Sequence, residues 1–231
     1  MCAGFRFILL LGGLAVKKFS AEADKIRVEE LYKYEREARA KGFKLIAGVD
    51  EAGRGSLVGA VVVAAVILPE NLYLERLDDS KKLSAKVREI LYEQIISVAI
   101  SWNAVAVPVE EIDTLNVYQA TLLGMKRAVE GLDVQPEFVL TDAMKVDFGK
   151  KIQSLSIIHG DALSASIAAA SIIAKVTRDR LADQWALTYP EYGFEHNRGY
   201  GTKEHLAAIE KFGACPLHRK SFNPVKSLQR K

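Results

Sequence analysis

Apolar residues follow two different periods along this chain. Between positions 24 and 41 they recur at roughly helical spacing among charged residues, which predicts a surface helix that Gly42 ends. Residues 43–49 and 60–68 are strand-like, and the second segment is apolar on every side before Pro69. A continuous run of this kind indicates a strand that is buried on both faces of a sheet covered by helices.

The same alternation continues toward the C-terminus. Helical spacing and capping residues predict further helices at residues 84–98, 115–132, 161–187 and 202–212. Further strands are expected at residues 102–107, 137–141 and 154–158. Strands alternate with helices and no internal repeat is visible, so the pattern predicts an α/β layered fold with a single catalytic domain.

The composition is that of an ordinary globular protein with enough apolar material for one sizeable core. Of 231 residues, 49% are hydrophobic and 26% are charged, and the formal net charge is +3. Residues 211–231 contain no acidic residue. Their cationic residues are Lys211, Arg219, Lys220, Lys226, Arg230 and Lys231. This tail is either a contact for a phosphate backbone or a solvated chain end.

Two cysteines, Cys2 and Cys215, cannot form a disulfide framework and show no metal-ligand spacing. The apolar run at residues 5–16 is too short to span a bilayer. Two lysines follow it directly, which reverses the charge order of a secretory signal. A helical extension or a misplaced start codon explains the run better than a signal, so we expect a cytoplasmic protein that does not enter a membrane.

The segment GVDEAGRG, directly after the first strand, carries the most chemical information. Adjacent side chains on a strand point to opposite faces, so Asp50 and Glu51 face one cleft only if the chain leaves the pleat there. Gly53 and Gly55 allow that turn and let the backbone approach a ligand closely. Arg54 between them offers a donor fork for phosphate or sugar oxygens. The alternative is a strand-terminal turn with solvated acids.

Two more acids stand at comparable places in the pattern. Asp142 ends the strand at residues 137–141, and Asp161 stands where the long helix is expected to begin. Each alone is typical of a turn or a helix cap. Together with Asp50 and Glu51 they would form a site of oxygen ligands only, which suits Mg²⁺ or Mn²⁺ better than zinc. Without a cation, these like charges would raise one another's pKa.

At this point several separated motifs resemble one known family. They lie at residues 50–55, 79–83, 141–143, 160–162, 167–179, 199–202 and 218–222. In this order and spacing they closely resemble bacterial ribonuclease HII from about Lys44 to Phe222. Such a series is far more specific than a single glycine motif.

The resemblance implies an RNase H-like fold, in which helices flank a central mixed sheet and the C-terminal part is helical. We accordingly expect an N-terminal helical extension at residues 1–42, a catalytic domain at residues 43–205 and a basic helical tail at residues 206–231. It also implies that the four metal-site acids of the family map onto Asp50, Glu51, Asp142 and Asp161.

The resemblance further assigns substrate contacts. The loop at residues 53–55 would sense the ribose 2′-hydroxyl, and Tyr200 would pack on the nucleotide at the RNA-to-DNA junction. Arg54 separates this family from ribonuclease HIII, which usually has lysine there. The chain departs from the family at Ser56 and Ala60, where proline is common. These departures put the stiffness of the catalytic loop in question more than its chemistry.

The implied activity is cleavage of the RNA strand of RNA–DNA hybrids, and of the phosphodiester 5′ to a ribonucleotide embedded in duplex DNA. The products would carry a 3′-hydroxyl and a 5′-phosphate. Two cations, Mg²⁺ or Mn²⁺, roughly 3.5–4 Å apart would serve an in-line attack by water. Asp50 and Asp161 are expected as direct ligands, with Glu51 and Asp142 completing the shell. We expect a monomer whose partner is the duplex.

Outer contacts of this site are less distinctive. Lys81 and Lys82 precede a helix and are candidates for phosphate contact, although a solvated loop explains them nearly as well. Asn116 and Gln119 are candidates for hydrogen bonds to sugar or phosphate, and a helix cap explains Asn116 almost equally. Three charged residues of the long helix are expected to shape the surroundings of the site, namely Lys175, Arg178 and Asp179.

Three rival functions remain open from the sequence. A junction-resolving nuclease of the same fold would cut pure DNA and spare a duplex with an embedded ribonucleotide. A binding module without catalysis is disfavoured because four acids repel phosphate. A secreted or membrane-tethered protein rests only on residues 5–16.

Overall fold

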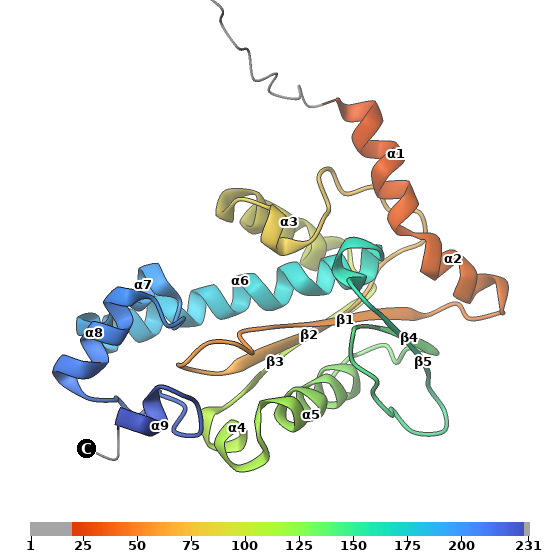
Figure 1. Ribbon diagram of the computed structural model, residues 1–231. Coiled ribbons are helices and arrows are strands. Elements are labelled where there is room, and N and C mark those ends of the chain that lie inside the picture. Colours follow the sequence, from red (N-terminus) through yellow and green to blue (C-terminus); the bar gives the residue numbers. More distant parts are fainter. Residues whose placement is uncertain (1–19, 229–231) are drawn as a thin grey trace, which may run out of the picture.

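A mixed sheet runs through the middle of the molecule (Figure 1). The computed structural model describes residues 20–228. The strands are β1 Ile46–Ala52, β2 Val61–Ile67, β3 Ser101–Val107, β4 Phe138–Asp142 and β5 Gln153–Ile157. Their order is β3-β2-β1-β4-β5. The three strands β3, β2 and β1 run antiparallel, whereas β4 and β5 lie parallel to β1.

Helices cover both faces of this sheet (Figure 1). They are α3 Ala85–Val98, α4 Val109–Leu115, α5 Val117–Glu130 and α6 Ala165–Thr188. Val62 and Ala64 of β2 pack toward α6 and α3. Val61 and Val63 pack on the opposite face against α5. The fully buried strand and the mixed sheet flanked by helices are confirmed.

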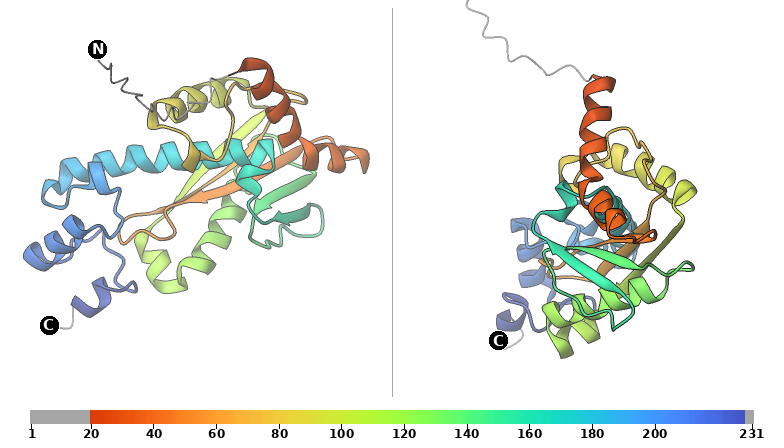
Figure 2. Two further views of the ribbon diagram at one scale, coloured as in Figure 1. Left: turned by 45° about the horizontal axis from the view of Figure 1, so that its top comes forward. Right: turned by 90° about the vertical axis from the view of Figure 1, so that its right-hand side faces the viewer.

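Helices at the two ends of the chain lie on opposite sides of the molecule (Figures 1 and 2). The N-terminal pair is α1 Ala21–Leu31 and α2 Lys33–Ala40, which join at Tyr32. Val28 and Leu31 belong to the core built by β2 and α6. The C-terminal elements are the 3₁₀ turn η3 Pro190–Tyr192 and the helices α7 Phe194–Asn197, α8 Lys203–Phe212 and α9 Val225–Leu228. They make the C-terminal part helical, as predicted.

Three expectations about local structure are wrong. The long helix begins at Ala165 under a cap from Ser164, whereas Asp161 lies in a separate 3₁₀ turn, η2 Gly160–Ala162. The helix expected at residues 115–132 is divided at Asn116, whose φ of 72° belongs to neither α4 nor α5. The first strand is displaced along the sequence from residues 43–49 to Ile46–Ala52.

Parts of the sequence analysis lie outside the described residues. These parts are the apolar run at residues 5–16, Cys2, Arg230 and Lys231. Within residues 20–228, no helix is both long and apolar enough to cross a membrane.

Candidate active site

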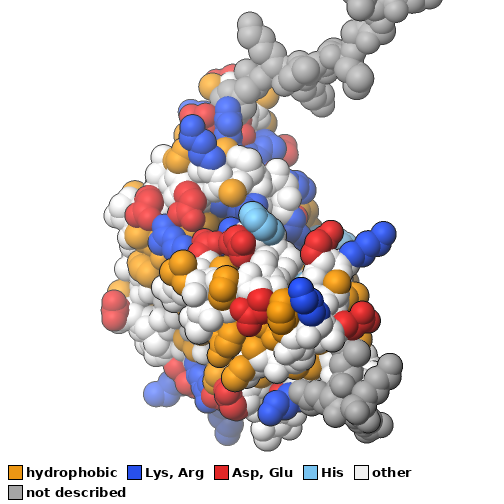
Figure 3. Space-filling model, turned by 90° about the vertical axis from the view of Figure 1, so that its left-hand side faces the viewer, with side chains coloured by type: hydrophobic (Ala, Val, Ile, Leu, Met, Phe, Trp, Pro, Cys, Tyr) orange, Lys and Arg blue, Asp and Glu red, His pale blue; other side chains and the backbone are white. Residues whose placement is uncertain are grey.

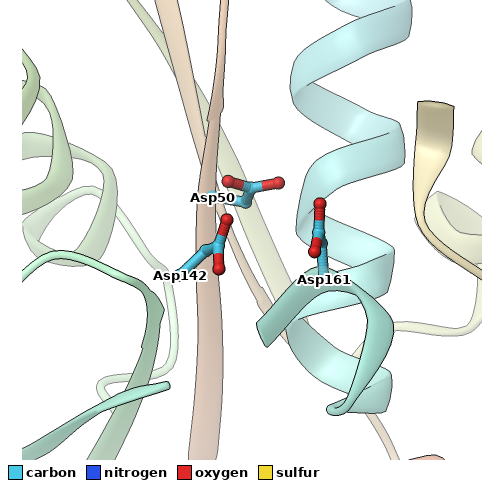
Figure 4. A group of neighbouring side chains, drawn as sticks. All are labelled: Asp50, Asp142 and Asp161. Carbon is cyan, nitrogen blue, oxygen red and sulfur yellow. The ribbon is translucent and has the colours of Figure 1, made fainter. Parts of the chain in front are cut away.

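Three aspartates converge where the sheet meets the start of α6 (Figure 4). Asp50 comes from β1, Asp142 ends β4, and Asp161 lies on η2. One carboxylate oxygen from each lies within 4.8 Å of the others. The backbone N–H of Gly160 donates to Oδ1 of Asp142 at 2.7 Å, which ties the turn carrying Asp161 to the end of β4.

Gly48 sets how closely α6 approaches the sheet. A Cβ added at Gly48 would lie 2.0 Å from the carbonyl carbon of Ser166, so a larger residue would push the first turn of α6 away from β1. Gly48 stands two residues before Asp50 on the same face of the strand. The absence of a side chain there therefore helps to bring Asp161 within reach of Asp50.

Glu51 takes a different direction. Asp50 pairs with Ala64, whose side chain packs toward α6. Glu51 pairs with Val63, which packs toward α5. Because β1 continues through both acids, the expectation that the chain leaves the pleat between them is wrong. One carboxylate oxygen of Glu51 accepts from Arg54 at 3.1 Å, and the other is buried with no hydrogen-bond partner in the described structure.

The acids repel one another in a poorly solvated place. Burial raises the pKa of Asp50 well above its usual range, and the charges of Glu51 and Asp142 raise it further. Burial likewise raises the pKa of Glu51. The pKa of Asp142 is also raised, by burial and then by the charge of Asp161, against a hydrogen bond from Gly160. The cluster thus lacks positive charge at its centre.

Lys81 pairs with Asp161 at the outer edge of this cluster. Its Nζ lies 2.8 Å from Oδ2 of Asp161, and its side chain is 73% exposed. Burial alone would lower the pKa of Lys81, but the hydrogen bond and charge of Asp161 outweigh it and raise the pKa. Lys81 therefore carries a full charge at the edge of the site.

The donor set fits a hard divalent cation. Its members are carboxylate oxygens, which Mg²⁺ and Mn²⁺ prefer over nitrogen or sulfur. Glu51 is not one of the three converging aspartates, but its charge acts on Asp50, and its buried oxygen without a partner among the described residues is a further acceptor near them. A bound cation would relieve the repulsion that raises the pKa of Asp50.

Two fully buried arginines hold the glycine loop from behind. Gly53 has a φ of 92°, and a Cβ there would lie 1.9 Å from Nε of Arg178. Arg219 donates to the carbonyl oxygens of Gly53 at 2.8 Å and Arg54 at 2.9 Å. It also donates to the carbonyl of Gly59 at 2.9 Å. The loop is fixed by side chains distant in the sequence.

Ser56 also holds this loop through hydrogen bonds. Its buried Oγ accepts from Nη2 of Arg178 at 2.7 Å. The same oxygen lies 3.0 Å from the carbonyl of Gly53 and 3.1 Å from that of Val58, so its single proton can go to either. Hydrogen bonds thus supply stiffness where the related family commonly has proline. Ala60 is buried as well.

Arg219 fits neither reading of the basic tail, a contact for a phosphate backbone or a solvated chain end. Its side chain is fully buried, whereas Lys211, Lys220 and Lys226 are exposed. Acidic and basic side chains are interspersed on the face of the molecule shown in Figure 3. No pattern in the sequence separates Arg219 from Lys220, because the partners of the arginine lie 160 to 166 positions earlier.

The other predicted contacts are spread around the site. Tyr200 is 40% exposed, and its ring centroid lies 5.4 Å from the Cζ of Arg178. Lys82 is exposed next to Lys81. Asn116 caps α5, since its Oδ1 accepts from the backbone N–H of Gln119 at 3.1 Å and from that of the preceding residue. Gln119 itself is exposed on the first turn of α5.

Solved structures share this architecture. Ribonuclease H2 from Pyrococcus horikoshii superposes with a TM-score of 0.70 at 26% sequence identity, over 81% of this chain and 98% of that chain. The mixed sheet, the long helix and the aspartates at the ends of adjacent strands define a nuclease of the RNase H-like class.

Sequence comparison narrows this class to one family. The family model described as ribonuclease HII matches residues 47–225. Ribonuclease HII of Enterococcus faecalis is 52% identical over 200 residues, which cover 87% of this chain and 78% of that protein. That of Ligilactobacillus salivarius is 49% identical over 220 residues, or 93% of this chain and 86% of that protein. The chain belongs to the ribonuclease HII family.

Proposed function

We propose that this enzyme cuts the RNA strand of RNA–DNA hybrids and the phosphodiester 5′ to a ribonucleotide embedded in duplex DNA. The products carry a 3′-hydroxyl and a 5′-phosphate. Asp50, Asp142 and Asp161 hold Mg²⁺ or Mn²⁺, with two ions in the catalytic state, and Glu51 completes the shell. The observation that carries this proposal is the convergence of three carboxylates, whose oxygens lie within 4.8 Å of one another, near the glycine loop at residues 53–55.

A divalent cation bound here supplies positive charge for the reacting phosphodiester and makes water a competent nucleophile near neutral pH. The carboxylates of Asp50 and Asp161 orient that charge from β1 and η2. Lys81, at the exposed edge of the cluster, is placed to meet a phosphate oxygen of the scissile strand. Arg54, whose side chain is 43% exposed and pairs with Glu51, offers a second cation for the strand.

Discrimination between RNA and DNA requires a contact to the 2′-hydroxyl. The carbonyls of Gly53 and Arg54 are engaged by Arg219, so we expect the N–H groups of residues 53–55 to face the ribose. Tyr200 stacks on the neighbouring sugar, and its exposed ring beside Arg178 supports that role. Lys82, Asn116 and Gln119 are expected to contact the backbone farther from the cut.

Replacing Asp50 with Asn tests the metal mechanism. Loss of a metal ligand removes several kcal/mol of transition-state stabilisation. We expect cleavage of a DNA duplex with one ribonucleotide to slow by at least about 10³-fold. Binding of the same duplex, measured by fluorescence anisotropy, should persist. The matched control is Asp133→Asn, an exposed aspartate on the loop before β4, which should cleave normally.

Two results would contradict this proposal. Unchanged cleavage by Asp50→Asn would remove the metal mechanism. Cleavage of an all-DNA duplex, without a cut 5′ to the ribonucleotide, would favour a junction-type nuclease instead. We further expect the enzyme to act as a cytoplasmic monomer, which cell fractionation and light scattering of the purified protein would check.

A further inference from the structure

Glu35 on α2 is a buried carboxylate that the proposed reaction does not use. Its side chain belongs to a residue only 3% exposed, on a helix that precedes the segment matched by the family model. One oxygen, Oε1, accepts from Oγ of Ser164 at 2.6 Å. The same oxygen accepts from the backbone N–H of Ser166 at 2.9 Å and from its Oγ at 2.5 Å.

These two serines begin α6. Ser164 is the N-cap, and its Oγ accepts from the backbone N–H of Ile167 at 3.3 Å while it donates to Glu35. A negative charge at this place interacts favourably with the positive end of the helix dipole. Glu35 therefore joins α2 to the first turn of α6 by accepting from two serine hydroxyls and one backbone amide.

The same turn leads directly to the acid cluster. The backbone N–H of Ser164 donates to the carbonyl of Gly160 at 2.9 Å, closing the turn that carries Asp161. The N–H of Gly160 in turn donates to Asp142. A continuous series of contacts thus runs from Glu35 through Ser164 and Gly160 to both aspartates.

We propose that Glu35 is a positioning residue for the metal site, holding the turn of Asp161 against Asp50 and Asp142. This inference rests on the proposed function, because it assigns Glu35 a part in cation binding. Gly48 fixes how near α6 comes to the sheet, whereas Glu35 fixes the start of the helix by hydrogen bonds. Its second oxygen, Oε2, is buried with no hydrogen-bond partner among the described residues.

The unpartnered oxygen of Glu35 helps to decide between two roles for this residue: positioning the metal site, or only linking α2 to α6. Burying a carboxylate with one oxygen unsatisfied is unfavourable, so an apolar residue would join α2 to α6 at lower cost. An apolar residue could not accept from Ser164 and Ser166, however. The acceptor is what the start of α6 requires, and the turn that carries Asp161 directly precedes that start.

The test is Mn²⁺ binding by titration calorimetry at pH 7, on the full chain without substrate. Partners of metal-binding groups typically change metal affinity by 10–100-fold, and we expect about 10-fold weaker binding for Glu35→Ala. Glu35→Gln keeps an acceptor oxygen and should stay within about 3-fold of the wild type. Ser166→Ala removes one hydroxyl and should weaken binding by less than Glu35→Ala, which keeps the test open should the latter not fold.

Asp24→Ala is the matched control. Asp24 is a second buried carboxylate of the N-terminal helices, 8% exposed. It accepts from the backbone N–H of Arg76 at 2.8 Å and from the hydroxyl of Tyr73 at 3.0 Å, so it serves the loop before α3 rather than α6. Asp24→Ala should lower the unfolding temperature and leave Mn²⁺ affinity unchanged.

Three outcomes overturn the inference. The first is wild-type Mn²⁺ affinity in Glu35→Ala, or in Ser166→Ala where Glu35→Ala does not fold. The others are a loss of Mn²⁺ affinity in Asp24→Ala equal to that in Glu35→Ala, and an equal loss in Glu35→Gln, which would point to the charge of Glu35 instead of its acceptor oxygen. If the wild type itself shows no Mn²⁺ binding that Asp50→Asn abolishes, the metal site of the proposed function fails, and this inference fails with it. The titrations of wild type and Asp50→Asn together distinguish the two failures.

Discussion

Replacing Gly53 with Ala tests whether the catalytic loop is held by the buried arginines. Gly53 has a φ of 92°, in a region that residues with a Cβ rarely adopt. The new Cβ would also stand 1.9 Å from Nε and 2.5 Å from Cδ of Arg178. Arg178 is fully buried, so its side chain cannot move aside into solvent.

The cost has two parts. The left-handed backbone contributes about 1–2 kcal/mol. Displacing Arg178 breaks its hydrogen bond to Ser56, 2.7 Å long, or that to the carbonyl of Arg198, 2.9 Å long. A hydrogen bond that involves a charged group contributes about 1.5–3 kcal/mol. Together they lower the free energy of unfolding by about 2.5–5 kcal/mol.

Urea denaturation followed by circular dichroism measures this difference, and thermal melting provides a second reading. For a domain of this size, about 2.5–5 kcal/mol corresponds to a fall of about 5–20 °C in Tm. Gly55→Ala is the control, because a Cβ at Gly55 would have no neighbour within 4 Å. If the two variants lose the same free energy within about 0.5 kcal/mol, the loop is not held as described.

Two further predictions concern the surroundings of this loop. Ser56→Ala removes the acceptor for the buried Arg178 and should lower the free energy of unfolding, measured in urea, by about 1–3 kcal/mol. A change within about 0.5 kcal/mol would show that this hydrogen bond does not hold the loop. Burial, followed by the charge of the neighbouring His205, lowers the pKa of His218 from 6.5 to about 4. The folded state therefore binds this proton less readily than the unfolded state, so the stability that wild type holds above pH 6.5 should decline as pH falls toward 4. Unfolding free energies of wild type and His218→Gln, compared at pH 7 and pH 5, should differ less at pH 5; a constant difference would contradict the assignment.

Much of the architecture follows from local patterns. The apolar run of β2 and the helical spacing of α3 depend on residues that are neighbours in the chain, so each could be predicted without knowing the rest of the fold. Capping residues behave in the same way, as Ser84 and Thr202 show at the starts of α3 and α8. The convergence of Asp50, Asp142 and Asp161 was also predicted, because each follows or ends a recognisable element.

Predictions of where the acidic side chains point, and on which element each lies, were less successful. The sequence could not show that β1 continues past Glu51, since the pairing of β1 with β2 decides where the strand ends. The resulting alternation sends Glu51 toward α5 and Asp50 toward α6. Asp161 was likewise expected as the start of the long helix, but Ser164 provides the cap and leaves Asp161 on its own turn.

What the sequence alone determined is therefore the order of strands and helices, the α/β class and the acids that meet at the sheet. Only the tertiary structure decided how these acids and the glycine loop are held. Arg219 and Glu35 carry no local pattern that sets them apart from exposed charged residues, and Arg178 was expected near the site without any sign that it is buried. Each is buried because its hydrogen-bond acceptors or donors come from segments 20 to 166 positions away, and such pairings exist only after the chain has folded.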